Sequence, residues 1–304
     1  MQAKAFVTHG PHQSALPSNA GAIIRLRDGR QLGYAEWGDR AGWPVFYFHG
    51  MPGSRLERCP DLSLLDRLGI RLVTVDRPGY GLSTFLPGRR FLDWPADVAQ
   101  LADALGVQRF TAVGVSGGGP HAAACAYLLP DRLRDVVIVS SPCPVSSWGS
   151  TAGMGLLQRL ALVLARLSPV LLRPLIWLVS NPARDPMAFT MAGYDRLAPA
   201  DRRVLARPEV RTMFVEDFRE SARQGVRGYA HDISLLARPW GFRPEDIAVP
   251  ASLWHGVDDT IVPVTMGGRL AEAIPRCRAH FLPDAGHFLA LDHLEDILQA
   301  EDLA

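Results

Sequence analysis

The chain has 304 residues, of which 48% are hydrophobic and 21% are charged, and its formal net charge at pH 7 is +1. This length and composition exclude an intrinsically disordered chain and suit one large α/β domain, or such a domain with an insertion. A net charge so close to zero gives no electrostatic reason to expect nucleic acid or an anionic membrane as a partner.

The cysteines and the N-terminal segment indicate where the protein is located. The four cysteines are scattered and form no C-x-x-C pair, so we expect neither a disulfide framework nor a zinc site, and a reducing compartment suits them. Residues 1–19 are predicted to be a disordered lead-in, and they lack the continuous apolar run of a signal peptide. The sequence therefore predicts a cytoplasmic protein.

The first half of the chain alternates β-type and helical segments. Asp28-Gly29 favours a tight turn, so the segments on either side of it, Ala22–Leu26 and Leu32–Trp37, are predicted to form a hairpin. Strands that alternate with helices form right-handed βαβ units, so we expect a mostly parallel sheet of about eight strands with flanking helices. The next predicted elements are strands at Val45–Phe48, Ile70–Asp76, Phe110–Val113 and Val136–Val139, and helices at Leu56–Leu68 and Trp94–Leu105.

The alternation stops after Pro144 and resumes near Ala251. Residues 145–245 are therefore predicted to be an inserted helical cap, with residues 20–144 and 246–304 forming the α/β core. Within the insertion, Met154–Ser180 is apolar and long enough to cross a membrane. Three arginines at seven-residue spacing and two prolines interrupt this segment, which favours two amphipathic lid helices over a span. Contact with a membrane interface is the other alternative.

After the insertion, the pattern returns to strands and helices. The predicted elements are a strand at Ala251–Gly256, a helix at Pro263–Ile274, a strand at Arg278–Leu282 and a closing helix at Phe288–Ala300. In parallel sheets of this kind, functional residues collect at the carboxyl ends of the strands.

One glycine-rich turn has the pattern of a nucleophile elbow. Gly114-Val115-Ser116-Gly117-Gly118 follows a predicted strand and precedes a good helix start, which is the context that such an elbow requires. A serine on so tight a turn has an unfavourable φ, and glycines two residues before and after it avoid a clash. The sequence thus predicts Ser116 as a catalytic nucleophile. The alternatives are a tight packing turn or a phosphate-binding loop.

A serine hydroxyl needs a base within hydrogen-bond reach, and His287 is the best candidate. It lies in a turn-rich loop just after a predicted strand, from which a side chain can reach back over the sheet. His293 lies in the predicted last helix and His280 lies in the middle of a strand, so both are weaker candidates.

The base needs an orienting acid, and the developing oxyanion needs two backbone donors. Asp258 and Asp259 both follow a predicted strand; we prefer Asp259, because it sits at the turn just before the next helix, while Asp258 could cap that turn. The predicted oxyanion donors are the N–H of Gly117, directly after the nucleophile, and the N–H of Met51.

Together these segments resemble the α/β-hydrolase superfamily, above all its capped, single-domain bacterial members. The resemblance spans roughly residues 20–302 and fits the cap least. It implies an eight-stranded sheet, the triad Ser116–Asp259–His287, an oxyanion hole of Met51 and Gly117, and no metal or organic cofactor. The segments that carry it are His49–Gly53, Asp76–Ser83, Gly114–Gly118, His255–Pro263 and Gly286-His287.

The activity implied is that of a serine hydrolase that cleaves a carboxylic ester through an acyl-enzyme. A carbon–carbon bond hydrolase and a lactonase would use the same triad, as would a lyase or perhydrolase side-branch. A non-catalytic or slow ligand receptor is the alternative from another class. Family members with aspartate at the elbow, the haloalkane dehalogenases and epoxide hydrolases, are set aside because this chain has Ser116. Proline iminopeptidases have tryptophan directly after the nucleophile, where this chain has Gly117, which weakens an assignment to that group.

The predicted partner is a small, largely apolar ester, with no nucleic acid and no integral membrane span. The apolar character is inferred from the predicted lid as a whole, while for any one of its residues ordinary packing on the core is the favoured explanation. These residues are Leu156, Leu157, Leu160, Leu164, Leu171, Leu172 and Trp177.

Overall fold

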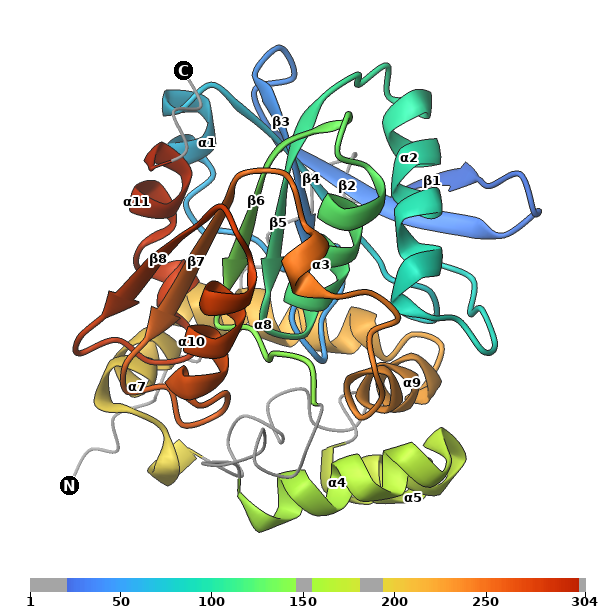
Figure 1. The fold of residues 1–304 in the computed structure, drawn as a ribbon, viewed down its shortest axis with the longest axis vertical. Helices are drawn as coiled ribbons and strands as arrows, with labels where there is room; N and C mark the ends of the chain where they lie inside the picture. Colours follow the sequence, from blue (N-terminus) through green and yellow to red (C-terminus); the bar gives the residue numbers. More distant parts are fainter. Residues whose placement is uncertain (1–20, 146–154, 181–193, 301–304) are drawn as a thin grey trace, which may run out of the picture.

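The computed structural model describes residues 21–145, 155–180 and 194–300 (Figure 1). Its centre is one eight-stranded sheet in the order β1-β2-β4-β3-β5-β6-β7-β8. β2 runs antiparallel to β1 and β4, and the other neighbours are parallel, so the predicted α/β sheet is confirmed. The strands are β1 (Ala22–Arg25), β2 (Gln31–Gly38), β3 (Trp43–Phe48), β4 (Ile70–Val75), β5 (Phe110–Val115), β6 (Leu133–Val139), β7 (Ala251–Gly256) and β8 (Cys277–Leu282).

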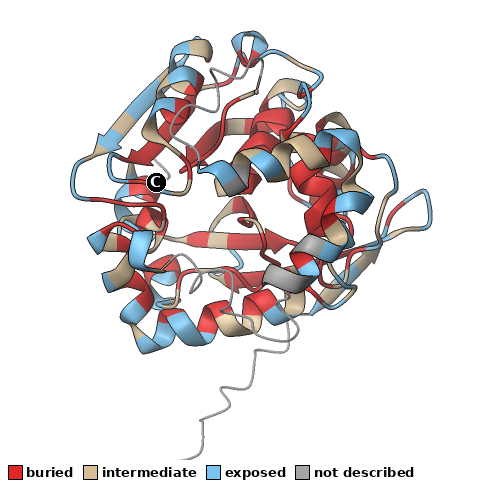
Figure 2. Ribbon diagram, turned by 90° about the horizontal axis from the view of Figure 1, so that it is seen from below, coloured by how far each residue is buried: buried red, intermediate tan, exposed pale blue. Residues whose placement is uncertain are grey.

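Helices cover both faces of this sheet, and each face has its own apolar core. On one face α2 (Trp94–Ala104), α3 (Gly119–Leu128) and α10 (Val264–Ala273) pack on side chains such as Phe46 and Ile138. On the other face α1 (Ser63–Arg67) and α11 (Leu294–Gln299) pack on the alternate side chains of the same strands. Figure 2 shows the result, with buried strands at the centre and exposed residues on the outer faces of the helices. Burial on both faces explains the continuous apolar runs of the central strands.

Two predicted helices are shorter in the structure than the sequence suggests. The helix predicted for Leu56–Leu68 is only α1, because the chain before it forms a loop whose backbone N–H groups bind carboxylates: Arg55 N donates to Asp76 at 2.7 Å. The closing helix predicted for Phe288–Ala300 is a 3₁₀ turn at Leu289–Leu291 followed by α11. Both regions border the candidate site.

Helices make up most of the described residues between β6 and β7. The helices of these described residues include α4 (Leu156–Leu167), α5 (Pro169–Ser180), α7 (Pro199–Ala206), α8 (Pro208–Ser221) and α9 (Arg227–Leu236). α4 and α5 pack on α9 through a small apolar cluster that includes Leu172 and Ile233. α7 and α8 form a second cluster, against which Phe288 and Leu291 of the core are packed. The insertion therefore contacts the core beside the loop that carries His287.

The apolar segment predicted to contain two helices forms α4 and α5 in its described part, and its role as a lid stays a prediction. Pro169 opens α5, whereas Pro174 lies inside it and does not end it as expected. Among the described residues, no helix is long and apolar enough to cross a membrane. The predicted lead-in, residues 1–19, lies outside the described part of the chain.

Candidate active site

The turn after β5 holds Ser116 in the conformation expected of a nucleophile elbow. Its φ is +52°, in the left-handed region that side chains other than glycine rarely adopt. A Cβ on Gly114 would lie 2.5 Å from the Gly118 carbonyl oxygen, and one on Gly118 only 2.0 Å from that of Phe48. Both positions therefore require glycine because the backbones approach so closely.

Loops after three different strands bring Ser116, His287 and Asp259 together. The Oγ of Ser116 lies 3.0 Å from Nε2 of His287, and Nδ1 of His287 lies 2.8 Å from Oδ2 of Asp259. Asp259 is 7% exposed and His287 6%, so water reaches neither ring nor carboxylate freely. This is the geometry in which a serine can pass its proton to a histidine that a carboxylate orients.

The alternative residues lie elsewhere. Asp258 is exposed, whereas the second oxygen of Asp259 accepts the N–H groups of Ile261 and Val262, both at 2.8 Å. His293 is a surface residue that contacts Asp296 in α11. His280 stacks on Trp254 with 3.9 Å between ring centroids. Of the predicted bases and acids, only His287 and Asp259 lie beside Ser116.

Burial and charge act in opposite directions on these two groups. Burial lowers the pKa of His287, but the Asp259 carboxylate outweighs it, with a smaller contribution from Asp201, and the net pKa is raised. Burial likewise raises the pKa of Asp259, but His287 and His255 outweigh it and the net pKa falls. Asp259 is therefore an anion at neutral pH, as a residue that stabilises an imidazolium must be.

The loop after β3 has its peptide groups held in fixed directions. The buried guanidinium of Arg77 donates to the carbonyl oxygens of His49 and Gly50, the latter at 2.9 Å, and the N–H of Gly50 donates to Glu57 at 2.8 Å. In a trans peptide the N–H points opposite to the carbonyl. The N–H of Met51 is thus directed away from Arg77. A Cβ on Gly117 would lie 2.8 Å from that of Met51, so the two residues whose N–H groups are the predicted oxyanion donors are neighbours.

A buried ion cluster lies behind this loop. Asp232 of α9 accepts from Nε of Arg77 at 2.9 Å, from Arg89 and from the Tyr80 hydroxyl at 3.0 Å. Burial raises the pKa of Asp232, but Arg89 and Arg77 outweigh it and hold the net pKa well below its usual range. The cluster links the insertion to the carbonyls of the candidate oxyanion loop.

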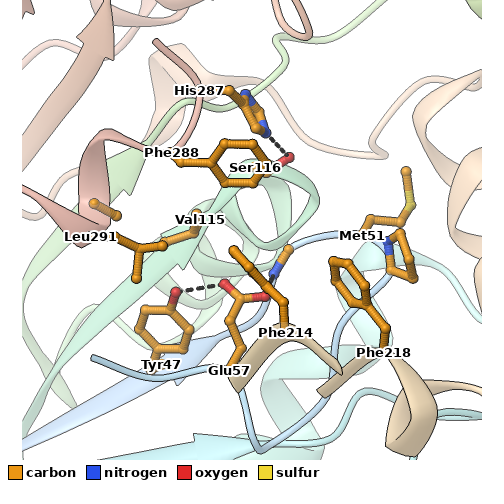
Figure 3. Close-up of a pocket in the computed structure, with 13 residues that line it drawn as sticks. Tyr47, Met51, Glu57, Val115, Ser116, Phe214, Phe218, His287, Phe288 and Leu291 are labelled. Carbon is orange, nitrogen blue, oxygen red and sulfur yellow. Dashed lines mark hydrogen bonds between the residues drawn. The ribbon is translucent and has the colours of Figure 1, made fainter. Parts of the chain in front are cut away.

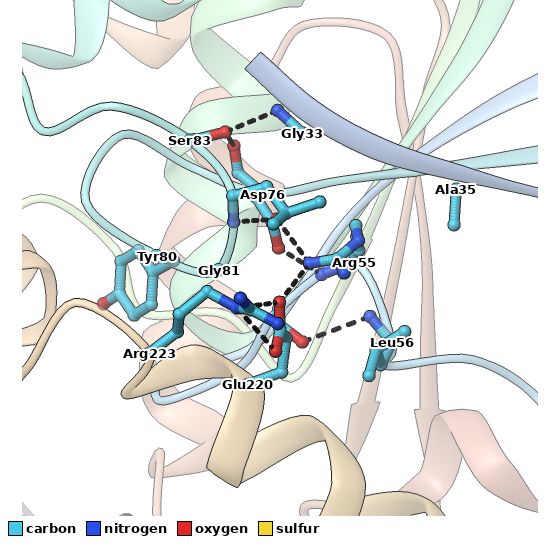
Figure 4. Close-up of polar contacts among 12 residues, drawn as sticks. Gly33, Ala35, Arg55, Leu56, Asp76, Tyr80, Gly81, Ser83, Glu220 and Arg223 are labelled. Atoms are coloured by element: carbon cyan, nitrogen blue, oxygen red, sulfur yellow. Dashed lines mark hydrogen bonds and ion pairs between the residues drawn. The ribbon is translucent and has the colours of Figure 1, made fainter. Parts of the chain in front are cut away.

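A second set of polar contacts ties α8 to the other end of that loop (Figure 4). Arg55 donates to Oδ2 of Asp76 at 2.9 Å and to Glu220 of α8 at 2.7 Å. Ser54 donates through both its N–H and its hydroxyl to Asp217 of α8, each at 2.7 Å. Asp76 also accepts the N–H of Leu82, so the carboxylate at the start of the 76–83 segment holds that loop and the loop at Arg55 together.

A cavity opens beside Ser116 and His287, and most of its lining is apolar (Figure 3). Phe214 and Phe218 reach it from α8, and Phe288 and Leu291 from the segment after His287. The apolar lid residues predicted to face the substrate do not line it, where their side chains are described. Leu156, Leu160, Leu171 and Trp177 are exposed on α4 and α5, and Leu172 packs inside the insertion. The remaining lining residues are Tyr47, Gly50, Met51, Pro52, Glu57, Val115 and Ala290.

Two polar side chains of this cavity, those of Tyr47 and Glu57, could not be recognised from the sequence. Glu57 is buried, and its two oxygens accept the Tyr47 hydroxyl at 2.6 Å and the N–H of Gly50. Burial raises the pKa of Glu57, which those hydrogen bonds partly offset. Within the described residues, no group of three or more histidine, cysteine, aspartate or glutamate side chains is arranged to hold a metal ion.

The family of the chain follows from comparison with known proteins. The family model of the alpha/beta hydrolase fold matches residues 44–294. The chain therefore belongs to the alpha/beta hydrolase fold family and is a hydrolase by that membership. Solved structures agree on the fold: a bromoperoxidase from Bacillus anthracis superposes with a TM-score of 0.71 at 23% identity, covering 93% of this chain and 98% of that one.

Curated relatives are named for several different activities. A bifunctional esterase/perhydrolase of Acinetobacter calcoaceticus is 26% identical over 90% of this chain and 95% of its own length. A 2-hydroxymuconate semialdehyde hydrolase of Pseudomonas putida is 25% identical over 84% of each chain. A non-heme chloroperoxidase of Streptomyces lividans is 34% identical over 44% of this chain, and the match spans only 49% of that protein.

Proposed function

We propose that this protein is a serine hydrolase that cleaves a carboxylic ester, a carboxylesterase, with Ser116, His287 and Asp259 as its triad. The observation that carries the proposal is the unbroken hydrogen-bond chain from Ser116 through His287 to Asp259, at 3.0 and 2.8 Å, beside a largely apolar cavity. The esterase activity in the name of the Acinetobacter relative supports the same reaction class.

In the proposed reaction the Ser116 oxygen attacks the ester carbonyl carbon while Nε2 of His287 takes the hydroxyl proton. The N–H groups of Met51 and Gly117 stabilise the negative charge that develops on the carbonyl oxygen. The protonated His287 then gives that proton to the departing alcohol. Water attacks the acyl-enzyme with His287 as base, which releases the acid and restores Ser116.

The helical insertion acts as the cap in this proposal. Phe214 and Phe218 of α8 form one wall of the cavity, opposite Ser116 in Figure 3, so the insertion supplies apolar surface to the substrate. A small, largely apolar acyl or alcohol group fits such walls. The cytoplasmic location expected from the sequence stays a prediction.

A carbon–carbon bond hydrolase is the second candidate, because the Pseudomonas relative is named for such a substrate. That substrate's name denotes a carboxylic acid, which would bring a negative charge into the cavity. Glu57 is the acidic side chain of the lining, and no arginine or lysine is among the described lining residues. This charge pattern favours a neutral ester over an anionic substrate.

The test is labelling with a fluorophosphonate probe, with Ser116→Ala beside the wild type, followed by turnover of p-nitrophenyl esters of increasing chain length. We expect labelling that the substitution abolishes and turnover that peaks at a short or medium chain. Labelling without ester turnover would move the substrate to carbon–carbon bonds or lactones, or indicate a receptor. Folded wild-type protein that takes no label would overturn the proposed nucleophile.

A further inference from the structure

Helix α7 of the insertion places a buried carboxylate against the loop that carries His287. Oδ2 of Asp201 accepts the backbone N–H of His287 at 3.0 Å, and Oδ1 accepts that of Phe288 at 2.9 Å. Asp201 is 1% exposed. Both carboxylate oxygens are thus committed to two consecutive N–H groups, a bidentate contact that fixes the direction of the peptides on either side of the His287 Cα.

The residue before His287 is shaped to receive this carboxylate. A Cβ on Gly286 would lie 2.2 Å from Oδ2 of Asp201, and the three atoms nearest to it all belong to the Asp201 carboxylate. The φ of Gly286 is not in the left-handed region, so its backbone conformation alone would allow alanine. Glycine at this position therefore serves the close approach of Asp201.

We propose that Asp201 is a positioning residue for the catalytic base: from the insertion, it holds the 286–288 backbone so that His287 meets both Ser116 and Asp259. This inference rests on the proposed function. It makes the insertion part of the catalytic scaffold, in addition to a wall of the substrate cavity. Nothing in the α/β core supplies a second carboxylate for these two N–H groups among the described contacts.

The neighbouring contacts of the insertion follow the same pattern. α8 holds the loop after β3 through Asp217, and α9 reaches it through Asp232 and Arg77. Asp201, Asp217 and Asp232 are each no more than 2% exposed. A buried carboxylate destabilises the fold unless hydrogen bonds satisfy its oxygens. Each of these three contacts therefore depends on its helix staying docked against the loop that it binds.

The charge of Asp201 also acts on the base. The groups that face His287 are Asp259 and Ser116 from the loops after β7 and β5, Asp201 from α7 and Glu57 from the loop after β3. His255 lies behind Asp259 and shares its Oδ2 at 3.3 Å. After burial and Asp259, the Asp201 charge is the next contributor to the pKa of His287, and it raises that pKa. Removing the charge should therefore make His287 harder to protonate.

The first experiment compares Asp201→Ala and Asp201→Asn with the wild type and with Asp195→Asn, an exposed acid six residues earlier in the insertion. We expect kcat on a p-nitrophenyl ester to fall about 10- to 100-fold with KM changed little, because a misplaced base slows chemistry more than binding. The fluorophosphonate labelling rate should fall in parallel. The acidic limb of the pH profile of kcat/KM should move to lower pH in Asp201→Asn. The shift reports the Asp201 charge acting on His287 in an assembled site, whereas activity lost only because less protein is folded would leave that limb in place.

The second experiment is a double-mutant cycle with Gly286→Ala. In the wild-type background the new Cβ displaces the Asp201 carboxylate, and we expect a loss close to that of Asp201→Ala. In the Asp201→Ala background the same Cβ meets no carboxylate, so the double variant should be no slower than Asp201→Ala alone. This non-additivity reports the contact itself, whatever either variant does to stability.

The outcomes separate this inference from the proposed function. Wild-type protein without labelling would refute the nucleophile before Asp201 is considered. Wild-type labelling with unchanged rates and an unchanged pH limb in folded Asp201→Asn would overturn the positioning role. Additive losses in the cycle would also overturn it, because Gly286 and Asp201 would then act independently.

Discussion

The hydroxyl of Tyr47 donates a 2.6 Å hydrogen bond to Oε1 of Glu57 at the side of the cavity opposite His287 (Figure 3). Tyr47 belongs to β3 and Glu57 to the loop after it. Glu57 also accepts the N–H of Gly50, so the pair lies next to the peptides of the candidate oxyanion hole. Burial raises the pKa of both groups, and the tyrosine pKa rises further because Glu57 is its neighbour. The cavity thus combines phenylalanine walls with an acidic floor.

Glu57→Gln should change which substrates the cavity accepts. The amide oxygen can still accept the N–H of Gly50, while the amide nitrogen can donate to Tyr47, so the shape is kept and the charge is lost. For p-nitrophenyl esters of equal length, we expect wild-type kcat/KM to be lowest when the acyl chain ends in a carboxylate. The substitution should reduce the ratio of kcat/KM for the neutral ester to kcat/KM for the anionic ester by about 10-fold.

Glu216→Gln is the matched control for charge, because Glu216 pairs with Arg58 and does not line the cavity. It should leave the ratio of kcat/KM between neutral and anionic esters as in the wild type. A wild-type enzyme that turns over the anionic ester as fast as the neutral one would contradict the role given to Glu57.

Asp259→Asn should lower activity and shift its pH dependence. The pKa of His287 is raised, so kcat/KM falls as the pH drops through a value above the ordinary histidine pKa of about 6.5, since only the neutral ring can act as base. Asp259 is the main cause of the increase, and its removal should move this acidic limb to lower pH. Loss of the correct tautomer should reduce kcat about 10⁴-fold, by analogy with the serine protease triad.

Asp258→Asn tests the assignment at the neighbouring residue, whose side chain is exposed. Measuring the activity of both variants from pH 5 to 9 would decide which of the two aspartates orients His287. A large loss in Asp258→Asn with a nearly normal Asp259→Asn would reverse the assignment.

The triad geometry was within reach of the sequence because each of its residues is marked by local chain chemistry. Gly114 and Gly118 identify the turn around Ser116, and the order of strands places Asp259 and His287 at the same edge of the sheet. The contacts between the insertion and the core are not indicated by any local sequence pattern. Ser54 and Asp217 lie 163 residues apart, and their hydrogen bond depends on how a helix of the insertion docks on the core. Propensity and periodicity describe the helix but not its docking.

The same limit explains the error about the substrate wall. The apolar runs in α4 and α5 suggested substrate contact, yet α8, which is less apolar and has charged residues along it, supplies Phe214 and Phe218. Which face of a helix meets a cavity is decided by the partners that cover its other faces, and those partners are distant in sequence.

Arg77→Lys should impair catalysis without removing a charge. Arg77 donates to two carbonyls and to Asp232 at once, which the single ammonium of lysine cannot reproduce. We expect kcat on short esters to fall about 10- to 100-fold because the N–H of Met51 loses its fixed direction. Urea unfolding should also show a loss of about 1–3 kcal/mol from unsatisfied buried carbonyls.

Arg71→Lys provides the comparison, since Arg71 pairs with Glu36 on β2 and β4, outside the site. Kinetics of this variant should stay close to the wild type. Equal kcat values for Arg77→Lys and Arg71→Lys would mean that the Arg77 contacts do not orient the oxyanion loop.

Phe218→Ala should enlarge the cavity and move the acyl-chain preference to longer esters. Phe218 lines the cavity from α8 and is 4% exposed, so its loss leaves space that additional methylene groups can fill. We expect the chain-length optimum of kcat/KM on p-nitrophenyl esters to increase by two or more carbons, with about 3–5 kcal/mol lost in unfolding free energy. Trp177→Ala is the matched aromatic control, because Trp177 is 59% exposed on α5 and does not line the cavity. It should leave the chain-length optimum unchanged, whereas a shift in Trp177→Ala alone would return the substrate wall to the α4 and α5 helices that the sequence first indicated.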